Sequence, residues 1–78
     1  MKLRPLPAIK VIKALENFGF KAIRKKGSHV ILRNDEGVTI VIPVHSGEEL
    51  GKGILMKIIR QAGLTRDEFL RAIEHNSK

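Results

Sequence analysis

The first apolar residues of the chain recur with the period of an amphipathic helix. Their i, i+3, i+4, i+7 spacing places the side chains on one helical face: Ala8, Val11, Ile12 and Leu15. Gly19 follows them, and glycine commonly ends a helix because it tolerates left-handed backbone angles. We therefore predict a helix over roughly residues 8–18.

Three segments with strand-like composition come next, at residues 20–25, 30–34 and 38–42. The sequence Asn-Asp-Glu-Gly at 34–37 is typical of a hairpin turn, and Pro43 ends the third segment. Apolar residues occupy consecutive positions in the last two segments, so their pattern does not show which face is buried. These segments predict a three-stranded antiparallel sheet.

The hairpin turn also predicts which residues pair. If the turn centres on Asp35 and Glu36, the pairs are Arg33 with Val38, Ile31 with Ile40, and His29 with Ile42. The end of the third strand then lies beside residues 27–29.

Two further helices are predicted in the last third of the chain, after a glycine-containing loop at 44–53. The apolar stripe of the first comprises Ile54, Leu55, Ile58, Ile59 and Ala62, and Gly63 closes it. Thr65 and Glu68 match the capping box that begins many helices. The stripe of this last helix comprises Phe69, Leu70 and Ile73, and the helix should fray by Asn76.

The predicted order is α-β-β-β-α with an extra short C-terminal helix, which belongs to the α+β class. We expect the sheet to pack against the first two helices. A chain of 78 residues has room for one hydrophobic core and not for two, so residues 1–78 should form a single domain.

The charge balance of the chain indicates what kind of partner it binds. The chain has 15 Lys and Arg residues and eight Asp and Glu residues, which gives a formal net charge of +7. Such a surface favours a polyanion: nucleic acid, an acidic protein or an anionic membrane. The chain has no cysteine, which excludes disulfides and thiolate zinc sites and suits the cytoplasm.

Two other absences narrow the choice of partner. No apolar run approaches the ~20 residues that span a bilayer, and the polar start of the chain does not resemble a signal peptide. Aromatic residues are restricted to three phenylalanines, so base stacking requires one of them at the surface. We expect nucleic-acid binding, if present, to use charge, backbone shape and hydrogen bonds.

The segment Arg-Lys-Lys-Gly-Ser-His at 24–29 is the first candidate site. A turn that combines cations with free amides can hold a phosphate. Histidine takes up and releases protons near neutral pH, so His29 is a candidate proton-transfer group. A basic strand end followed by a structural histidine is the alternative interpretation.

His45 should emerge at the same end of the hairpin as His29. It is either a second proton-transfer group or a residue that only closes the loop before the next helix. No carboxylate or third histidine joins the two at metal-site spacing, so we expect neither a metal nor another cofactor. His75 lies in the predicted fraying tail and should be inert.

Several short motifs together resemble the HicA toxin family. They occur in the family's order over about residues 8–70: Asn-Phe-Gly-Phe at 17–20, Gly-Ser-His at 27–29, Pro-Val-His at 43–45, Leu-Gly-Lys-Gly-Ile-Leu at 50–55 and Ile-Arg-Gln-Ala-Gly-Leu at 59–64. The resemblance implies a fold like the double-stranded RNA-binding domain. Ile54 departs from the family, whose members often have Thr or Ser there.

The same resemblance implies an activity and partners. The family's members are mRNA interferases, which are endoribonucleases inhibited by an antitoxin of the HicB family. The family's catalytic histidine corresponds to His29, which would act as the base toward the ribose 2′-hydroxyl or, with reversed roles, as the acid. The expected RNA-binding residues are Lys25, Lys26, Gly27, Ser28, His45 and Lys52, with Lys57 as a further cation. A solvated helix face is the simpler explanation for Lys52 and Lys57.

Three other functions remain possible from the residues alone. A non-catalytic module for double-stranded RNA would share the charge and the fold. A protein-interaction module would direct its basic face to an acidic partner. A helix-turn-helix is disfavoured, because its recognition helix would carry Asp67, Glu68 and Glu74 against two arginines.

Overall fold

The fold is known from a computed structural model that describes residues 2–45 and 47–77. Its helices are α1 (Ala8–Glu16), α2 (Lys52–Gln61) and α3 (Arg66–Asn76). Its strands are β1 (Leu6–Pro7), β2 (Lys21–Lys26), β3 (His29–Arg33), β4 (Thr39–Pro43) and β5 (Glu49–Leu50). The α+β class and the α-β-β-β-α order with an additional C-terminal helix are confirmed.

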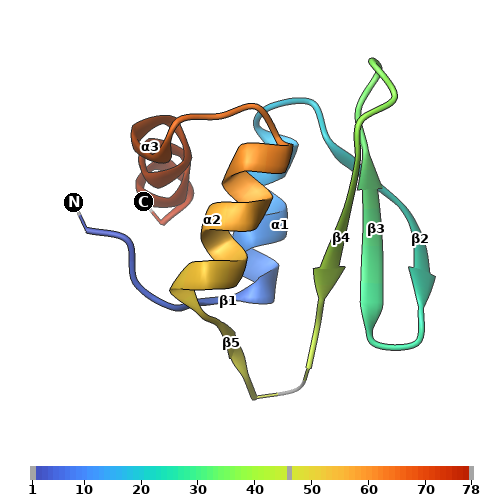
Figure 1. The fold of residues 1–78 in the computed structure, drawn as a ribbon, viewed down its shortest axis with the longest axis horizontal. Coiled ribbons are helices and arrows are strands. Elements are labelled where there is room, and N and C mark those ends of the chain that lie inside the picture. Colours follow the sequence, from blue (N-terminus) through green and yellow to red (C-terminus); the bar gives the residue numbers. More distant parts are fainter. Residues whose placement is uncertain (1, 46, 78) are drawn as a thin grey trace.

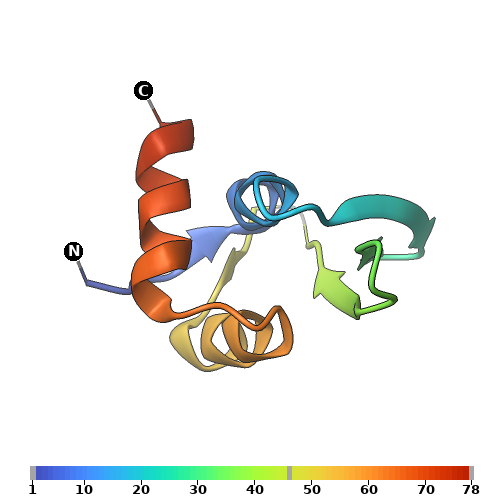
Figure 2. The same cartoon turned by 90° about the horizontal axis from the view of Figure 1, so that it is seen from above.

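The main sheet is antiparallel, with strand order β2-β3-β4. Helix α1 lies over one of its faces, α2 lies along its β4 edge, and α3 lies on the side of these helices away from the sheet (Figures 1 and 2). The C-terminal helix is not short: α3 has 11 residues, against 9 in α1 and 10 in α2. The predicted capping box begins it, because Glu68 N–H donates to the Thr65 hydroxyl and Thr65 N–H donates to the Glu68 carboxylate.

The predicted hairpin register is wrong by one residue. Strand β3 pairs with β4 as His29 with Pro43, Ile31 with Val41, and Arg33 with Thr39. The turn contains three residues between Asn34 and Val38 rather than two, and Gly37 occupies it with a φ of +83°. The Asn34 side chain accepts hydrogen bonds from Glu36 N–H and Val38 N–H, which stabilises this longer turn.

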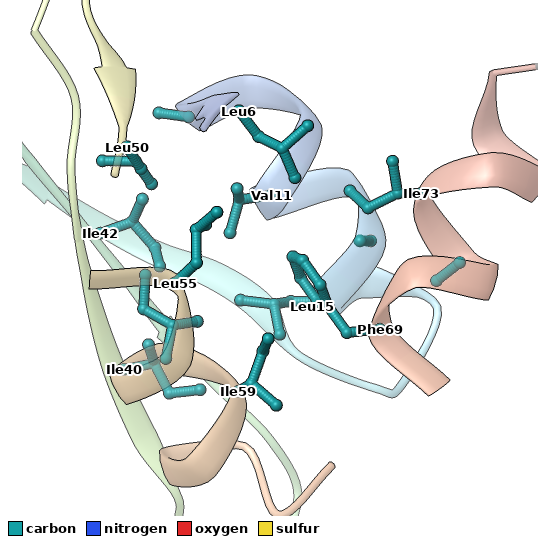
Figure 3. Packing of buried hydrophobic residues seen from close by; sticks show 14 of the residues in the cluster. Leu6, Val11, Leu15, Ile40, Ile42, Leu50, Leu55, Ile59, Phe69 and Ile73 are labelled. Carbon is teal, nitrogen blue, oxygen red and sulfur yellow. The ribbon is translucent and has the colours of Figure 1, made fainter. Parts of the chain in front are cut away.

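A single hydrophobic core lies between the helices and one face of the sheet. Leu32 contributes from β3. Ile40 and Ile42 come from β4, and Leu15, Leu55 and Phe69 come from the three helices (Figure 3). None of the described residues buries a charged or polar side chain. The alternation of buried and exposed positions along β4 shows which face of the sheet is covered.

The predicted loop at 44–53 contains a short strand. Strand β5 pairs antiparallel with β1, as Leu6 with Leu50 and Pro7 with Glu49. A strand of two residues has no period, so the sequence carries no signal for it. This pairing ties the segment before α1 to the segment before α2. None of the helices among residues 2–45 and 47–77 is long and apolar enough to cross a membrane.

Candidate functional site

A tight hairpin joins β2 to β3 and holds the candidate histidine at the start of β3. Lys26 pairs with His29 across it, and Gly27 and Ser28 form the two-residue turn. Gly27 has a φ of +58° and Ser28 does not have a positive φ, which is the pattern of a type II′ turn. Only glycine adopts this first position without strain, so the Gly-Ser pair is what places His29 directly opposite Lys26.

The face of the sheet away from the helices is basic. Residues that pair across antiparallel strands project from the same face, so the register groups Lys21 with Arg33, Arg24 with Ile31, and Lys26 with His29. We call Lys21, Arg24, Lys26 and Arg33 the basic sheet face, and all four side chains are exposed. Between Glu16 and Asp35 the chain has no carboxylate. Strands β2, β3 and β4 therefore present only cations and neutral groups to a phosphate that approaches this face.

Lys25 does not share this face. It pairs with Val30, whose side chain packs against the core, so Lys25 projects from the helix side of the sheet at an exposed edge. Successive residues of a strand point to opposite faces, so Lys25 and Lys26 cannot both lie beside the His29 ring. The structure brings Lys26 to the histidine and places Lys25 on the opposite side.

His29 also lines a groove between β4 and α2. The groove has a volume of about 420 Å³ and is lined by His29, Thr39, Val41, Pro43, Ile54, Lys57, Ile58 and Gln61. We call it the His29 groove. Its α2 wall follows a helical stripe, with Ile54, Lys57, Ile58 and Gln61 at i, i+3, i+4 and i+7. The exposed imidazole thus has a lysine across the hairpin and a second lysine across the groove.

His45 occupies a different hollow. The chain after β4 does lie beside the turn, since Val44 N–H donates to the Ser28 carbonyl over 2.6 Å. His45 nevertheless lines a hollow with the start of α1 and with Glu48 and Glu49, and it does not line the His29 groove. The two histidines share one end of the hairpin and not one site.

Lys52 is separated from His29 as well. It lines a hollow with Lys2, Met56 and Arg66, on the other side of α2. Lys52 and Lys57 are five positions apart, which places them about 140° apart around the helix axis. Only Lys57 faces the groove, so the structure distinguishes two lysines that the sequence treated alike.

Sequence reasoning missed Thr39, Val41 and Gln61 as groove residues. Thr39 and Val41 share a strand face with His29's partner Pro43, which only the correct register reveals. Gln61 lies seven residues after Ile54, so the helical period puts both side chains on one face of α2. That period did not indicate which strand the face meets.

The three phenylalanines leave little aromatic surface for ligand contacts. Phe20 and Phe69 are buried, and Phe18 is partly buried against the core. Among residues 2–45 and 47–77, no group of three or more His, Cys, Asp or Glu side chains is arranged to hold a metal ion. Contacts at the groove must therefore come from aliphatic side chains, the Lys57 ammonium group, the Gln61 carboxamide, the Thr39 hydroxyl and the imidazole.

Comparison with known proteins relates this arrangement to one family. The family model for the HicA toxin of bacterial toxin-antitoxin systems matches residues 9–64. The matched segment runs from α1 to the residue after the Ala62-Gly63 turn, so it contains every residue of the His29 groove and leaves out α3. No curated protein is similar enough to the chain to match it.

Proposed function

Because the chain belongs to the HicA family of toxins from bacterial toxin-antitoxin systems, we propose that it is an mRNA interferase that cleaves RNA with His29. The supporting observation is the position of the His29 imidazole, which is exposed between Lys26 across the hairpin and Lys57 across the groove. A phosphodiester held by these cations would lie beside an imidazole, which can serve as a general base.

The proposed reaction uses the nucleophile that RNA itself carries. His29 takes the proton of a ribose 2′-hydroxyl, and the oxygen attacks the adjacent phosphorus. The bond from phosphorus to the 5′-oxygen of the next nucleotide breaks, and water supplies the proton for that leaving oxygen because the groove is open to solvent. The products are a 2′,3′-cyclic phosphate and a 5′-hydroxyl. Lys26 and Lys57 stabilise the charge that develops on the phosphoryl oxygens.

The other predicted binding residues take different parts in the proposal. Gly27 and Ser28 shape the turn, and their amides are available to a phosphate beside Lys26. Lys25 contacts the RNA backbone from the helix side of the sheet, outside the groove. His45 and Lys52, each in another hollow, contribute at most to general attraction of the polyanion.

The reaction is tested with purified protein and a defined RNA in EDTA. Cleavage is expected to persist without divalent metal and to leave fragments with 2′,3′-cyclic phosphate and 5′-hydroxyl ends, identified by mass spectrometry. The rival function is a non-catalytic module for double-stranded RNA, which would bind duplexes and leave them intact. Binding without any cleavage would therefore overturn the enzyme assignment.

The toxin's partner is an antitoxin, and we assign it to the HicB type with an acidic surface that covers the basic sheet face and the mouth of the His29 groove. A net charge of +7 accelerates association with such a partner, because complementary fields raise the encounter rate. The prediction is checked by cleavage assays and by imidazole accessibility to diethyl pyrocarbonate in the complex. A complex that leaves His29 reactive and cleavage undiminished would contradict it. The cytoplasm is the compartment in which this proposed pair would meet mRNA.

A further inference from the structure

Two of the four large hydrophobic side chains that are exposed among the described residues meet in the His29 groove. Val41 on β4 is 47% exposed, and Ile54 on α2 is 44% exposed. Single exposed apolar residues are ordinary on protein surfaces. A pair on facing walls of a groove, next to an imidazole and a lysine, instead provides an apolar surface for a flat ligand group.

The groove has chemically different ends. Strand β4 runs toward Pro43 while α2 runs in the opposite direction away from Lys52, so His29 and Ile54 lie at one end and Thr39 and Gln61 at the other (Figure 1). The helical rise places Gln61 about 10 Å along the axis from Ile54. The far end therefore presents a carboxamide and a hydroxyl, which are both hydrogen-bond donors and acceptors.

We infer that the Gln61 end of the groove binds the nucleobase next to the cleaved phosphate and favours adenine, an inference that rests on the proposed function. The carboxamide of glutamine can donate to adenine N7 and accept from the N6 amino group at the same time. Val41, which lies between the two ends of the groove, contacts the face of the base, which the buried phenylalanines cannot do. Gln61 is thus a specificity-determining residue, and His29 acts on the phosphate at the other end.

The charge inside the groove favours RNA over an apolar peptide side chain. Lys57 lies between Ile54 and Gln61 on the α2 wall. An apolar side chain inserted there would remove water from the ammonium group without giving it a partner, which is costly. A nucleotide places a phosphate beside the same ammonium group while its base contacts the aliphatic walls.

The test compares single-stranded RNAs that differ only in the nucleotide beside one cleavage site. Cleavage efficiency is measured for the unaltered protein and for Gln61→Ala, Gln61→Glu and Arg60→Ala. Arg60 is the matched control, because it is exposed on α2 next to Gln61 and does not line the groove. Binding of the same RNAs to His29→Ala versions of these proteins, measured by fluorescence anisotropy, gives a readout independent of cleavage.

The unaltered protein should prefer adenine by roughly 5- to 150-fold, the range of one good bidentate contact. Gln61→Ala should remove this preference in cleavage and in binding. Gln61→Glu should shift it toward cytosine, whose N4 amino group donates to a carboxylate. Arg60→Ala should keep the original preference.

Three outcomes separate this inference from the proposed function. Cleavage with the same preference in the Gln61 variants would overturn the inference and leave the nuclease standing. Adenine-dependent binding that needs Gln61, without cleavage by the unaltered protein, would overturn the nuclease and support base reading by the groove. Unchanged nucleotide preference together with weakened antitoxin binding would show that the groove holds a protein side chain, which also overturns the inference.

Discussion

His29 and His45 emerge at the same end of one hairpin, yet their surroundings are opposite. His29 is opposite Lys26 and shares its groove with Lys57. His45 shares its hollow with Glu48 and Glu49. We expect an anionic phosphate to be attracted to the first position and repelled from the second, because lysines lie near one imidazole and carboxylates near the other. Proximity along a strand end therefore does not make two histidines one catalytic pair.

The largest expected effect comes from removing each imidazole in turn. His29→Ala should lower the rate of RNA cleavage by about 10²- to 10⁴-fold, the usual contribution of a proton-transfer group, whereas His45→Ala should change it by about twofold or less. Both side chains are exposed, so each change should alter the free energy of unfolding by no more than about 0.5 kcal/mol. Single-turnover cleavage and thermal unfolding measure the two quantities.

A large loss in His45→Ala at unchanged stability would make the two histidines a functional pair after all. Unfolding of the His29→Ala protein would instead indicate a structural histidine, and the enzyme assignment would then depend on the family alone.

A smaller effect is expected when the cation of the groove is removed. Lys57→Ala should weaken RNA binding severalfold and lower the slope of log affinity against log salt by about 1, because one phosphate contact is lost. Lys10→Ala is the matched control, since Lys10 is exposed on α1 and lines a hollow with α3 instead. Anisotropy titrations at several salt concentrations make the comparison, and equal slopes for the two variants would remove Lys57 from the RNA site.

The smallest effect should come from neutralising the acidic hollow. The double change Glu48→Gln and Glu49→Gln should raise RNA affinity by about twofold at low salt, and the gain should vanish near physiological salt, where charges are screened over about 8 Å. Cleavage by His29→Ala should stay defective in this background. Restored cleavage would mean that His45 becomes catalytic once its carboxylates are neutralised.

The sequence alone determined those features that local chemistry controls. The apolar stripes of α1, α2 and α3 follow the helical period and are buried or partly buried, except for Ile54, which is 44% exposed in the groove. The Thr65–Glu68 capping box is a contact between residues three positions apart. The same holds for the Gly27-Ser28 turn, in which one positive φ places His29 opposite Lys26. The family resemblance over the same motifs agrees with the match at residues 9–64.

Only the tertiary structure decided which of the candidate residues lie together. The turn is one residue longer than predicted, so Arg33 pairs with Thr39. Because side chains alternate between the two faces of a strand, this shift of one residue decides which residues of β4 lie on the same face as His29. The packing of α2 against β4 then selected Lys57 and Gln61 for the groove and turned Lys52 away from it. The strand register and the orientation of α2 both depend on contacts between segments that are distant in the chain, so the local sequence does not determine them.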